Sequence, residues 1–348
     1  MLYFVGLGLE QSPTLSSIEI LRKCQYVFYE SYTSPIVNQE IMSDLKRVLV
    51  DSSVENVKRE YIEDGKRILD LAKTSDIALV CSGDPMVATT HQELRTRALK
   101  QGTSTKIIHG SSVLCAVAGE LGLHSYSFGK TVTMTREPLQ YSAYHTVFRN
   151  LLSGLHTTIL LEWDESHNFF LTPKEAVRSL LAAEKDVKYG CLDDATILLV
   201  ASRIGTKAPS VRICRFKDIE TIEIGEPPHV MVIPGKLHFT EIEALSAITG
   251  ASPEIFLDNS SGIERIAHRM VTKYSEKTLA ALARARIAAA SASSKVKFEE
   301  VFENVECYTD DALRFLNEGR EELAVLSIGY AEGLLDSLRF GGLLEFEW

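Results

Sequence analysis

The sequence lacks the features that mark secreted and membrane-spanning proteins. Its six cysteines form no CxxC pair, and most lie in apolar stretches such as IALVCSGD, which is typical of buried thiols in a reducing compartment. No apolar run is long enough to span a bilayer, and the N-terminus MLYFVGLGLE lacks the basic start of a signal peptide. We therefore expect a cytoplasmic protein that has no membrane partner.

Basic residues and clustered metal ligands are also scarce. The chain has 47 acidic and 37 basic residues and a formal net charge of -10, so its surface as a whole should repel nucleic acid. Its nine histidines are scattered, without an HExxH motif or a His/Cys cluster at the spacing of metal ligands. The sequence thus predicts no nucleic-acid partner and no metal site.

What is present is an alternation of strand and helix patterns. Of the 348 residues 45% are hydrophobic and 24% charged, which suits a globular protein of two or three domains. Short apolar runs, among them LYFVG, QYVFYE, KRVLV and IALVC, alternate with segments of helical period in the first 140 residues. Continuous apolar strands separated by helices predict a mostly parallel sheet that is covered on both faces.

The pattern changes twice along the chain. Residues 131–255 again mix strand-like runs, such as HTTILLEW and ATILLVAS, with helical ones, which predicts a second α/β domain after residues 1–130. The junction near residues 128–135 is either one wall of a ligand cleft between the two domains or a plain linker. Residues 256–348 carry apolar side chains three or four apart, as in Phe298, Val301, Phe302 and Val305. They predict a small antiparallel helical domain.

Two glycine-containing turns follow strands of the first domain. In FVGLGLE, Gly6 and Gly8 favour either a tight turn or a close approach to a ligand, and Gln11 occupies the third glycine position of a GxGxxG fingerprint, which excludes it. In SGDP, Asp84 places a carboxylate at the carboxyl edge of the sheet. It could meet an amine or a sulfonium cation, or cap the following helix.

Two later motifs are weaker on their own. SFGKT imitates the end of a P-loop, but His124 stands where that motif needs its first glycine, so a nucleotide triphosphatase is excluded. In GEPPHVMVIPGKLH, Pro227 and Pro228 hold the approach to His229 rigid. A lone histidine at the start of a strand is more often structural than functional.

These pieces, together and in this order, resemble the diphthine synthase family of the tetrapyrrole-methylase fold. The resemblance rests on LYFVGLGLE, YVFYESYTS, SGDPMVATTHQELRTRA, LGLHSYSFGKT, GLHTTILL and GEPPHVMVIPGKLHFTEIEAL, which cover most of residues 1–250. The string GDPxVATTH is far more specific than any glycine pair.

The resemblance implies an α/β fold of two domains with a cofactor cleft between them, followed by a C-terminal all-α domain. It also implies homodimerisation, S-adenosyl-L-methionine as cofactor, and repeated methylation of a 3-amino-3-carboxypropyl-histidine on elongation factor 2, chiefly at the amine. No residue is named as catalytic base. Carried over by position, the cofactor-lining residues are Leu9, Asp84, Val87, Ser112, Val113, Leu161, Ile204 and His229.

The C-terminal stretch resembles a helical domain of unknown function found in archaeal proteins, through its YxDDAxxFL and YAEGLLD strings. It could contact a partner or simply stabilise the chain. Two other functions stay open: a methyltransferase of the same fold that acts on a tetrapyrrole or on ribosomal RNA, and a non-catalytic nucleoside-binding adaptor. The acidic charge argues against RNA, and YESYTS with GDPMVATTH favours the protein substrate.

Overall fold

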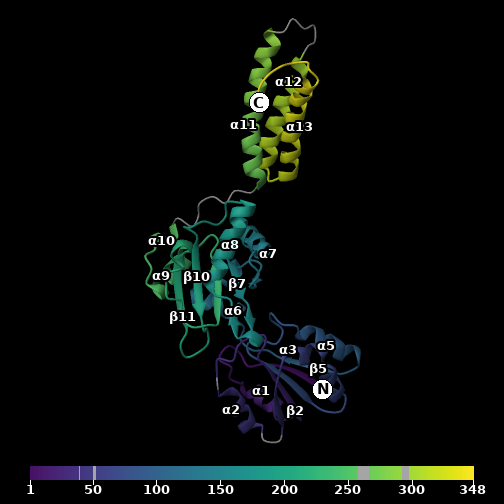
Figure 1. Ribbon diagram of the computed structural model, residues 1–348, viewed down its shortest axis with the longest axis vertical. Coiled ribbons are helices and arrows are strands. Elements are labelled where there is room, and N and C mark those ends of the chain that lie inside the picture. The colour runs from purple at the N-terminus through teal and green to yellow at the C-terminus, as the bar shows by residue number, and fades with distance from the viewer. Residues whose placement is uncertain (39, 50–51, 258–265, 292–297) are drawn as a thin grey trace. The chain divides into compact units, whose positions relative to one another are not determined.

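The structure is a computed structural model that describes residues 1–38, 40–49, 52–257, 266–291 and 298–348 (Figure 1). The chain divides into two compact units, Met1–Ser261 and Gly262–Trp348. The first unit contains two five-stranded sheets, and the second is helical where it is described. Among the described helices, none combines the length with the hydrophobicity that a membrane-spanning segment needs.

The first sheet is parallel throughout, with strand order β3-β2-β4-β1-β5. Its strands are β1 (Leu2–Gly6), β2 (Tyr26–Glu30), β3 (Ser53–Val57), β4 (Ile77–Cys81) and β5 (Thr105–Ile108). The central strand β4 is buried at every residue, as its unbroken apolar run IALVC requires. Parallel pairing brings the carboxyl ends of the strands to one edge of the sheet.

Helices cover both faces of this sheet. They are α1 (Leu15–Leu21), α2 (Ile41–Val48), α3 (Arg59–Asp64), α4 (Lys66–Ala72) and α5 (His91–Lys100). Helix α6 (Val113–Leu121), which follows β5, packs on the second sheet instead, through Val117 and Leu121. Neighbouring residues of β1 separate into different core clusters, Phe4 with Ile62 and Ile68 of α3 and α4, and Val5 with Leu45 of α2. The expected parallel sheet with two covered faces is confirmed.

One expected strand is wrong. Residues 46–48 of KRVLV end helix α2, and residue 50 lies outside the described residues. The buried residues Ile41, Leu45 and Leu49 lie four apart, so they form the inner face of a helix. The strand forms later in the chain, at β3.

The second sheet has the order β11-β10-β12-β7-β6 and is antiparallel except for the pair β6 and β7. Its strands are β6 (Val132–Met134), β7 (Thr157–Leu161), β10 (Ile197–Ser202), β11 (Ser210–Arg215) and β12 (His229–Ile233). A short hairpin of β8 (Trp163–Asp164) and β9 (Phe169–Phe170) follows β7. The accompanying helices are α7 (Tyr141–Leu152), α8 (Pro173–Val187), α9 (Phe239–Thr249) and α10 (Glu254–Leu257), with 3-10 turns at Ser125–Ser127, Glu165–His167 and Phe216–Asp218.

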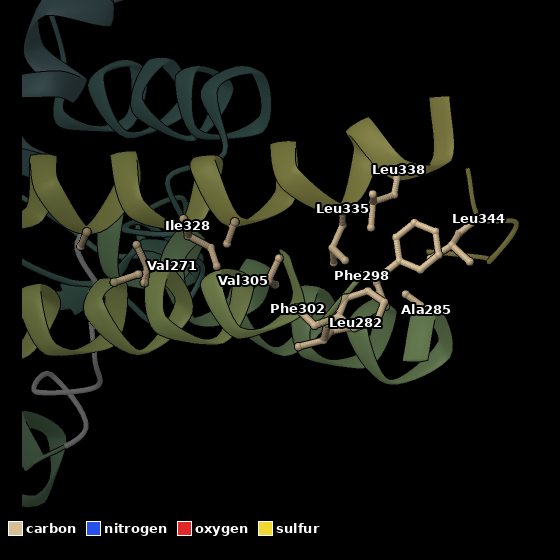
Figure 2. Close-up of a cluster of buried hydrophobic side chains, with 14 residues drawn as sticks. Val271, Leu282, Ala285, Phe298, Phe302, Val305, Ile328, Leu335, Leu338 and Leu344 are labelled. Atoms are coloured by element: carbon tan, nitrogen blue, oxygen red, sulfur yellow. The ribbon is translucent and has the colours of Figure 1, made fainter. Parts of the chain in front are cut away.

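The second unit buries its apolar side chains in a core of its own. Helices α11 (Ile266–Ser291), α12 (Glu299–Asn317) and α13 (Glu321–Phe340) each contribute to one cluster. Figure 2 shows Val271, Phe302, Val305, Ile328 and Leu335 of that cluster, which come from all three helices. The expected helical domain is confirmed.

Candidate functional site

Three loops meet closely at the carboxyl edge of the first sheet. A Cβ atom on Gly6 would lie 2.4 Å from the carbonyl oxygen of Gly83, and one on Gly110 would lie 2.3 Å from the same oxygen. The backbones of Gly8 and Gly83 also exchange two hydrogen bonds, of 3.1 and 2.9 Å. No side chain fits at Gly6 or Gly110, so these glycines let three backbone segments approach one another at the edge where α/β folds bind ligands.

A pocket opens at this edge, and we call it the edge pocket. Loops that follow strands of the first sheet line it, together with residues of the second sheet, among them Ser82 after β4, Leu161 at the end of β7 and Val113 at the start of α6. The structure brings all eight residues of the resemblance to its wall: Leu9, Asp84, Val87, Ser112, Val113, Leu161, Ile204 and His229.

Asp84 is the buried carboxylate of the first-sheet wall. One oxygen accepts a hydrogen bond from the backbone N–H of Met86 at 2.9 Å, and the other lies 2.7 Å from Nδ1 of His109. Only 8% of the side chain is exposed. Helix α5 starts at His91 with Thr90 as its cap residue, so Asp84 does not cap that helix. Its carboxylate is held in place beside the pocket instead.

The start of helix α6 forms the adjoining wall. Ser112 caps this helix by accepting a hydrogen bond from the N–H of Leu114 at 3.2 Å. The neighbouring Ser111 hydroxyl accepts one from the N–H of Leu9 at 3.0 Å, which ties the loop after β1 to the helix. Leu9 and Val113 therefore present apolar surface to the pocket from fixed positions.

The second sheet supplies the opposite wall through Leu161, Ile204 and His229. The Pro227-Pro228 bond is cis, and Nε2–H of His229 donates to the carbonyl oxygen of Gly225 at 3.1 Å. Burial lowers the pKa of His229, which keeps its ring neutral at neutral pH. Ile204 is 8% exposed and packs in the same core cluster as Leu9.

Sequence reasoning missed a further part of the wall, at the β8–β9 hairpin. Trp163 and Phe170 line the pocket, with Glu162 beside them. The indole N–H of Trp163 donates to the carbonyl oxygen of Ser31 at 2.9 Å, and the Ser31 hydroxyl donates to Glu165. These bonds tie the hairpin to the loop after β2. The aromatic pattern EW…FF after β7 was the signal that could have found it.

A buried polar cluster adjoins two of the loops that line the pocket. The Nδ1–H of His91 donates to the carbonyl oxygen of Pro85 at 3.0 Å, and its Nε2 lies 3.6 Å from the carboxylate of Glu30. Glu30 accepts backbone hydrogen bonds from Tyr32 and Thr33, each of 3.0 Å. Desolvation raises the pKa of Glu30 to about 7 and lowers that of His91 to about 4.

The thiol of Cys81 joins this cluster, and burial raises its pKa well above the usual value. The ligand atoms of Glu30, Cys81 and His91 lie within 4.8 Å of one another, so their geometry could hold a metal ion. Spacing along the sequence could not reveal the trio, because three separate segments bring it together. That the chain binds no metal stays a prediction.

Comparison with known proteins agrees with this geometry. Residues 1–220 match the family described as Tetrapyrrole (Corrin/Porphyrin) Methylases, and residues 273–344 match a family described as a protein of unknown function, DUF357. Diphthine synthase of Methanosphaera stadtmanae is 34% identical over 263 residues, which cover 74% of this chain and 99% of that protein. Diphthine synthase of Sulfurisphaera tokodaii is 37% identical over 254 residues, covering 71% and 98%. A crystal structure of a diphthine synthase superposes with a TM-score of 0.66 at 31% identity, covering 73% of this chain and 98% of that one.

The chain therefore belongs to the tetrapyrrole methylases, and its α/β part has the fold of that class. The helical tail matches the family of unknown function and lies outside the residues 1–220 that match the methylase family. Within the class, the chain is a member of the diphthine synthase family, and so an S-adenosylmethionine-dependent methyltransferase of diphthamide biosynthesis. The family expected from the sequence motifs is confirmed.

Proposed function

We propose that the edge pocket binds S-adenosyl-L-methionine and that the enzyme methylates, repeatedly, the 3-amino-3-carboxypropyl-histidine of elongation factor 2. The observation that carries the proposal is the character of the pocket wall. It contains the carboxylates of Asp84 and Glu162 and the neutral ring of His229, and among the described residues no Lys or Arg lines it. A cationic sulfonium group and a substrate amine both suit such a wall.

The side chains of the pocket act by position and by exclusion of water. The cofactor supplies an electrophilic methyl group on a sulfonium, so the displacement mainly needs an amine aligned with it and kept from solvent. Leu9, Val87, Val113, Leu161 and Ile204 provide the apolar surface for this. No buried group is required as a dedicated base, because the ammonium form of the substrate can transfer its proton to water or to a pocket carboxylate before the amine attacks.

The polar groups of the eight residues have separate tasks in this proposal. Asp84, fixed by Met86 and His109, offers a carboxylate to the cationic part of the cofactor or to the amine. Ser112 and the first turn of α6 offer backbone N–H groups to an anionic part of either ligand. His229, held by Gly225, offers the remaining ring nitrogen as an acceptor.

The proposal also covers the location, the oligomeric state and the partners of the enzyme. We place the enzyme in the cytoplasm as a homodimer, with elongation factor 2 as its protein partner and with neither nucleic acid nor membrane as a partner. The net charge of -10 supports the exclusion of nucleic acid. The division into domains at residues 1–130, 131–255 and 256–348 likewise stays our proposal.

Methyl transfer from labelled cofactor tests the function. Purified enzyme is incubated with tritiated S-adenosylmethionine and, separately, with elongation factor 2 bearing the 3-amino-3-carboxypropyl group, unmodified elongation factor 2, ribosomal RNA and a tetrapyrrole. We expect label on the modified factor alone. Label on RNA or on the tetrapyrrole would support the other methyltransferase reactions of this fold, and cofactor binding without any transfer would support an adaptor.

A further inference from the structure

The β8–β9 hairpin has two chemically different faces. Trp163 pairs directly with Phe170, and Asp164 pairs with Phe169, so the members of each pair share a face and the two pairs lie on opposite faces. Trp163 and Phe170 line the edge pocket. Phe169 lines a different pocket, where the guanidinium of Arg136 lies 4.4 Å from its ring centroid. The hairpin therefore presents only its Trp163–Phe170 face to the edge pocket.

The two rings of that face form one rigid surface. Their centroids lie 4.3 Å apart with 28° between the planes, and the indole N–H of Trp163 is fixed on the carbonyl oxygen of Ser31. Stacked rings anchored in this way lose little freedom when a ligand arrives. We call Trp163 and Phe170 the aromatic wall.

The carboxylates near this wall already have partners. Glu162 accepts hydrogen bonds from the backbone N–H of Arg136 at 2.6 Å and from its guanidinium at 3.2 and 3.3 Å. Asp84 is bonded to Met86 and paired with His109. Direct hydrogen bonding to these carboxylates therefore requires an N–H donor that can compete with the existing ones.

Repeated methylation removes such donors one by one. Each added methyl group replaces an N–H, so a fully methylated ammonium keeps its positive charge but can donate no hydrogen bond. An aromatic face attracts a cation of this kind without any donor, and tryptophan does so best. The aromatic wall is thus the feature of the pocket whose attraction survives every stage of the reaction.

We propose that Trp163 and Phe170 bind the partly methylated amino group of the substrate in its ammonium form. They thereby keep it in the pocket for the later transfers, before each of which it loses a proton to water and attacks as the free amine. This inference rests on the proposed function, because it assigns the amine of that substrate to one wall of the same pocket. Trp163 and Phe170 then determine how many methyl groups are added, and the cofactor-lining residues determine whether any methyl group is added.

Variants of the wall test this assignment by intact mass spectrometry of elongation factor 2. Trp163→Leu and Phe170→Leu should lower the rate of the later transfers by about tenfold, so that partly methylated forms accumulate. Trp163→Phe keeps an aromatic ring but loses the hydrogen bond to Ser31. It should give much more fully methylated product than Trp163→Leu does. Phe169→Leu, on the opposite face, is the matched control and should give the product distribution of the wild-type enzyme.

Calorimetry with S-adenosylhomocysteine accompanies each variant, and we expect the wild-type affinity throughout. The proposal is overturned if Trp163→Leu and Phe170→Leu give the wild-type distribution of methylated forms, or if Phe169→Leu shifts it equally. Loss of S-adenosylhomocysteine binding in both wall variants would also overturn it, because the rings would then belong to the cofactor site.

A fluorescence titration tests the wall without any methyl transfer. The chain has two tryptophans, and Trp348→Phe in the second unit leaves Trp163 as the reporter. With S-adenosylhomocysteine bound, tetramethylammonium should change Trp163 emission saturably, whereas the neutral tert-butanol should not. Phe170→Leu should weaken the affinity for tetramethylammonium in this titration at least threefold. An identical response to both probes would contradict the aromatic wall, even if elongation factor 2 proved not to be the substrate.

Discussion

At the scale of single residues, Asp84 is the side chain on which cofactor binding should depend most. Its carboxylate is buried, lies beside the pocket and does not cap helix α5. We expect Asp84→Ala to weaken S-adenosylmethionine binding by about tenfold or more, since a hydrogen bond to a charged group contributes roughly 1.5–3 kcal/mol. Calorimetry measures the affinity, with Ser166→Ala in the exposed turn between β8 and β9 as a control. Unchanged affinity together with a much lower melting temperature would show that Asp84 serves the fold alone.

Glu30 should make the stability of the fold depend on pH. Its pKa in the folded chain is about 7 against an ordinary value of 4.5, so the folded state binds more protons between these values than the unfolded state. The resulting stabilisation is complete below pH 4.5 and is lost as the pH rises through 7. His91 acts in the opposite direction, because its lowered pKa of about 4 favours the folded state above its ordinary value of 6.5.

The variant Glu30→Gln isolates the contribution of Glu30. It keeps an acceptor for the N–H groups of Tyr32 and Thr33 but carries no charge at any pH. We expect its melting temperature, relative to that of the wild-type chain, to rise steadily as the pH goes from 4.5 to 8. Each tenfold change in proton affinity corresponds to about 1.4 kcal/mol. Parallel pH profiles of the two proteins would show that Glu30 has an ordinary pKa in the folded chain.

Residue types explain which parts of the pocket could be predicted. Asp84 and His229 lie in short rigid motifs, SGDP and PPH, where glycine and proline mark unusual backbone and so draw attention to the residues beside them. The pair of Glu30 with His91 carries no such marker. Its role depends on contacts between segments far apart in the chain, which no local pattern encodes.

At the scale of elements, the meeting of three strand ends depends on glycines that no other residue can replace. In Gly110→Ala the new methyl group would lie 2.3 Å from the carbonyl oxygen of Gly83 and 2.6 Å from the nitrogen of Gly8. The loops that line the pocket would have to separate, so we expect a loss of about 1–3 kcal/mol of stability and weaker binding of S-adenosylhomocysteine. Thermal melts with and without this ligand measure both effects.

Gly119 offers the matched control within helix α6. No heavy atom lies within 4 Å of a Cβ placed there, and its backbone is helical. Gly119→Ala should therefore stabilise the chain by about 0.5–1 kcal/mol. If Gly110→Ala were as stable as the wild-type chain and bound the ligand equally well, the close packing of the three loops would be unnecessary for the pocket.

Elements were predictable where period and burial agree. Strand β4 and helix α8 follow directly from an unbroken apolar run and from a Thr172-Pro173 start with Glu175 in a capping box. Helix α2 was predicted wrongly at its end, because the short run KRVLV has the composition of a strand. The segment is helical because Ile41 and Leu45, four residues apart, both pack against the first sheet.

At the scale of the whole molecule, the helical tail should be dispensable for cofactor binding. Every residue of the edge pocket belongs to the unit Met1–Ser261, and the tail buries its apolar side chains in a separate core. We expect a chain that ends at Leu257 to fold and to bind S-adenosylhomocysteine within about twofold of the full-length affinity. Any defect should appear in turnover on elongation factor 2. A folded truncated chain that binds no ligand would show that the tail contributes to the pocket.

The most direct test of the account is methyl transfer itself, followed by intact mass spectrometry. Elongation factor 2 that carries the 3-amino-3-carboxypropyl group is incubated with S-adenosylmethionine and either the wild-type enzyme or Asp84→Ala at equal concentration. The account predicts successive additions of methyl groups to that one histidine with the wild-type enzyme, and a much lower rate with the variant at low cofactor concentration. The account would be contradicted if this factor gained no methyl group after prolonged incubation with wild-type enzyme that has bound its cofactor.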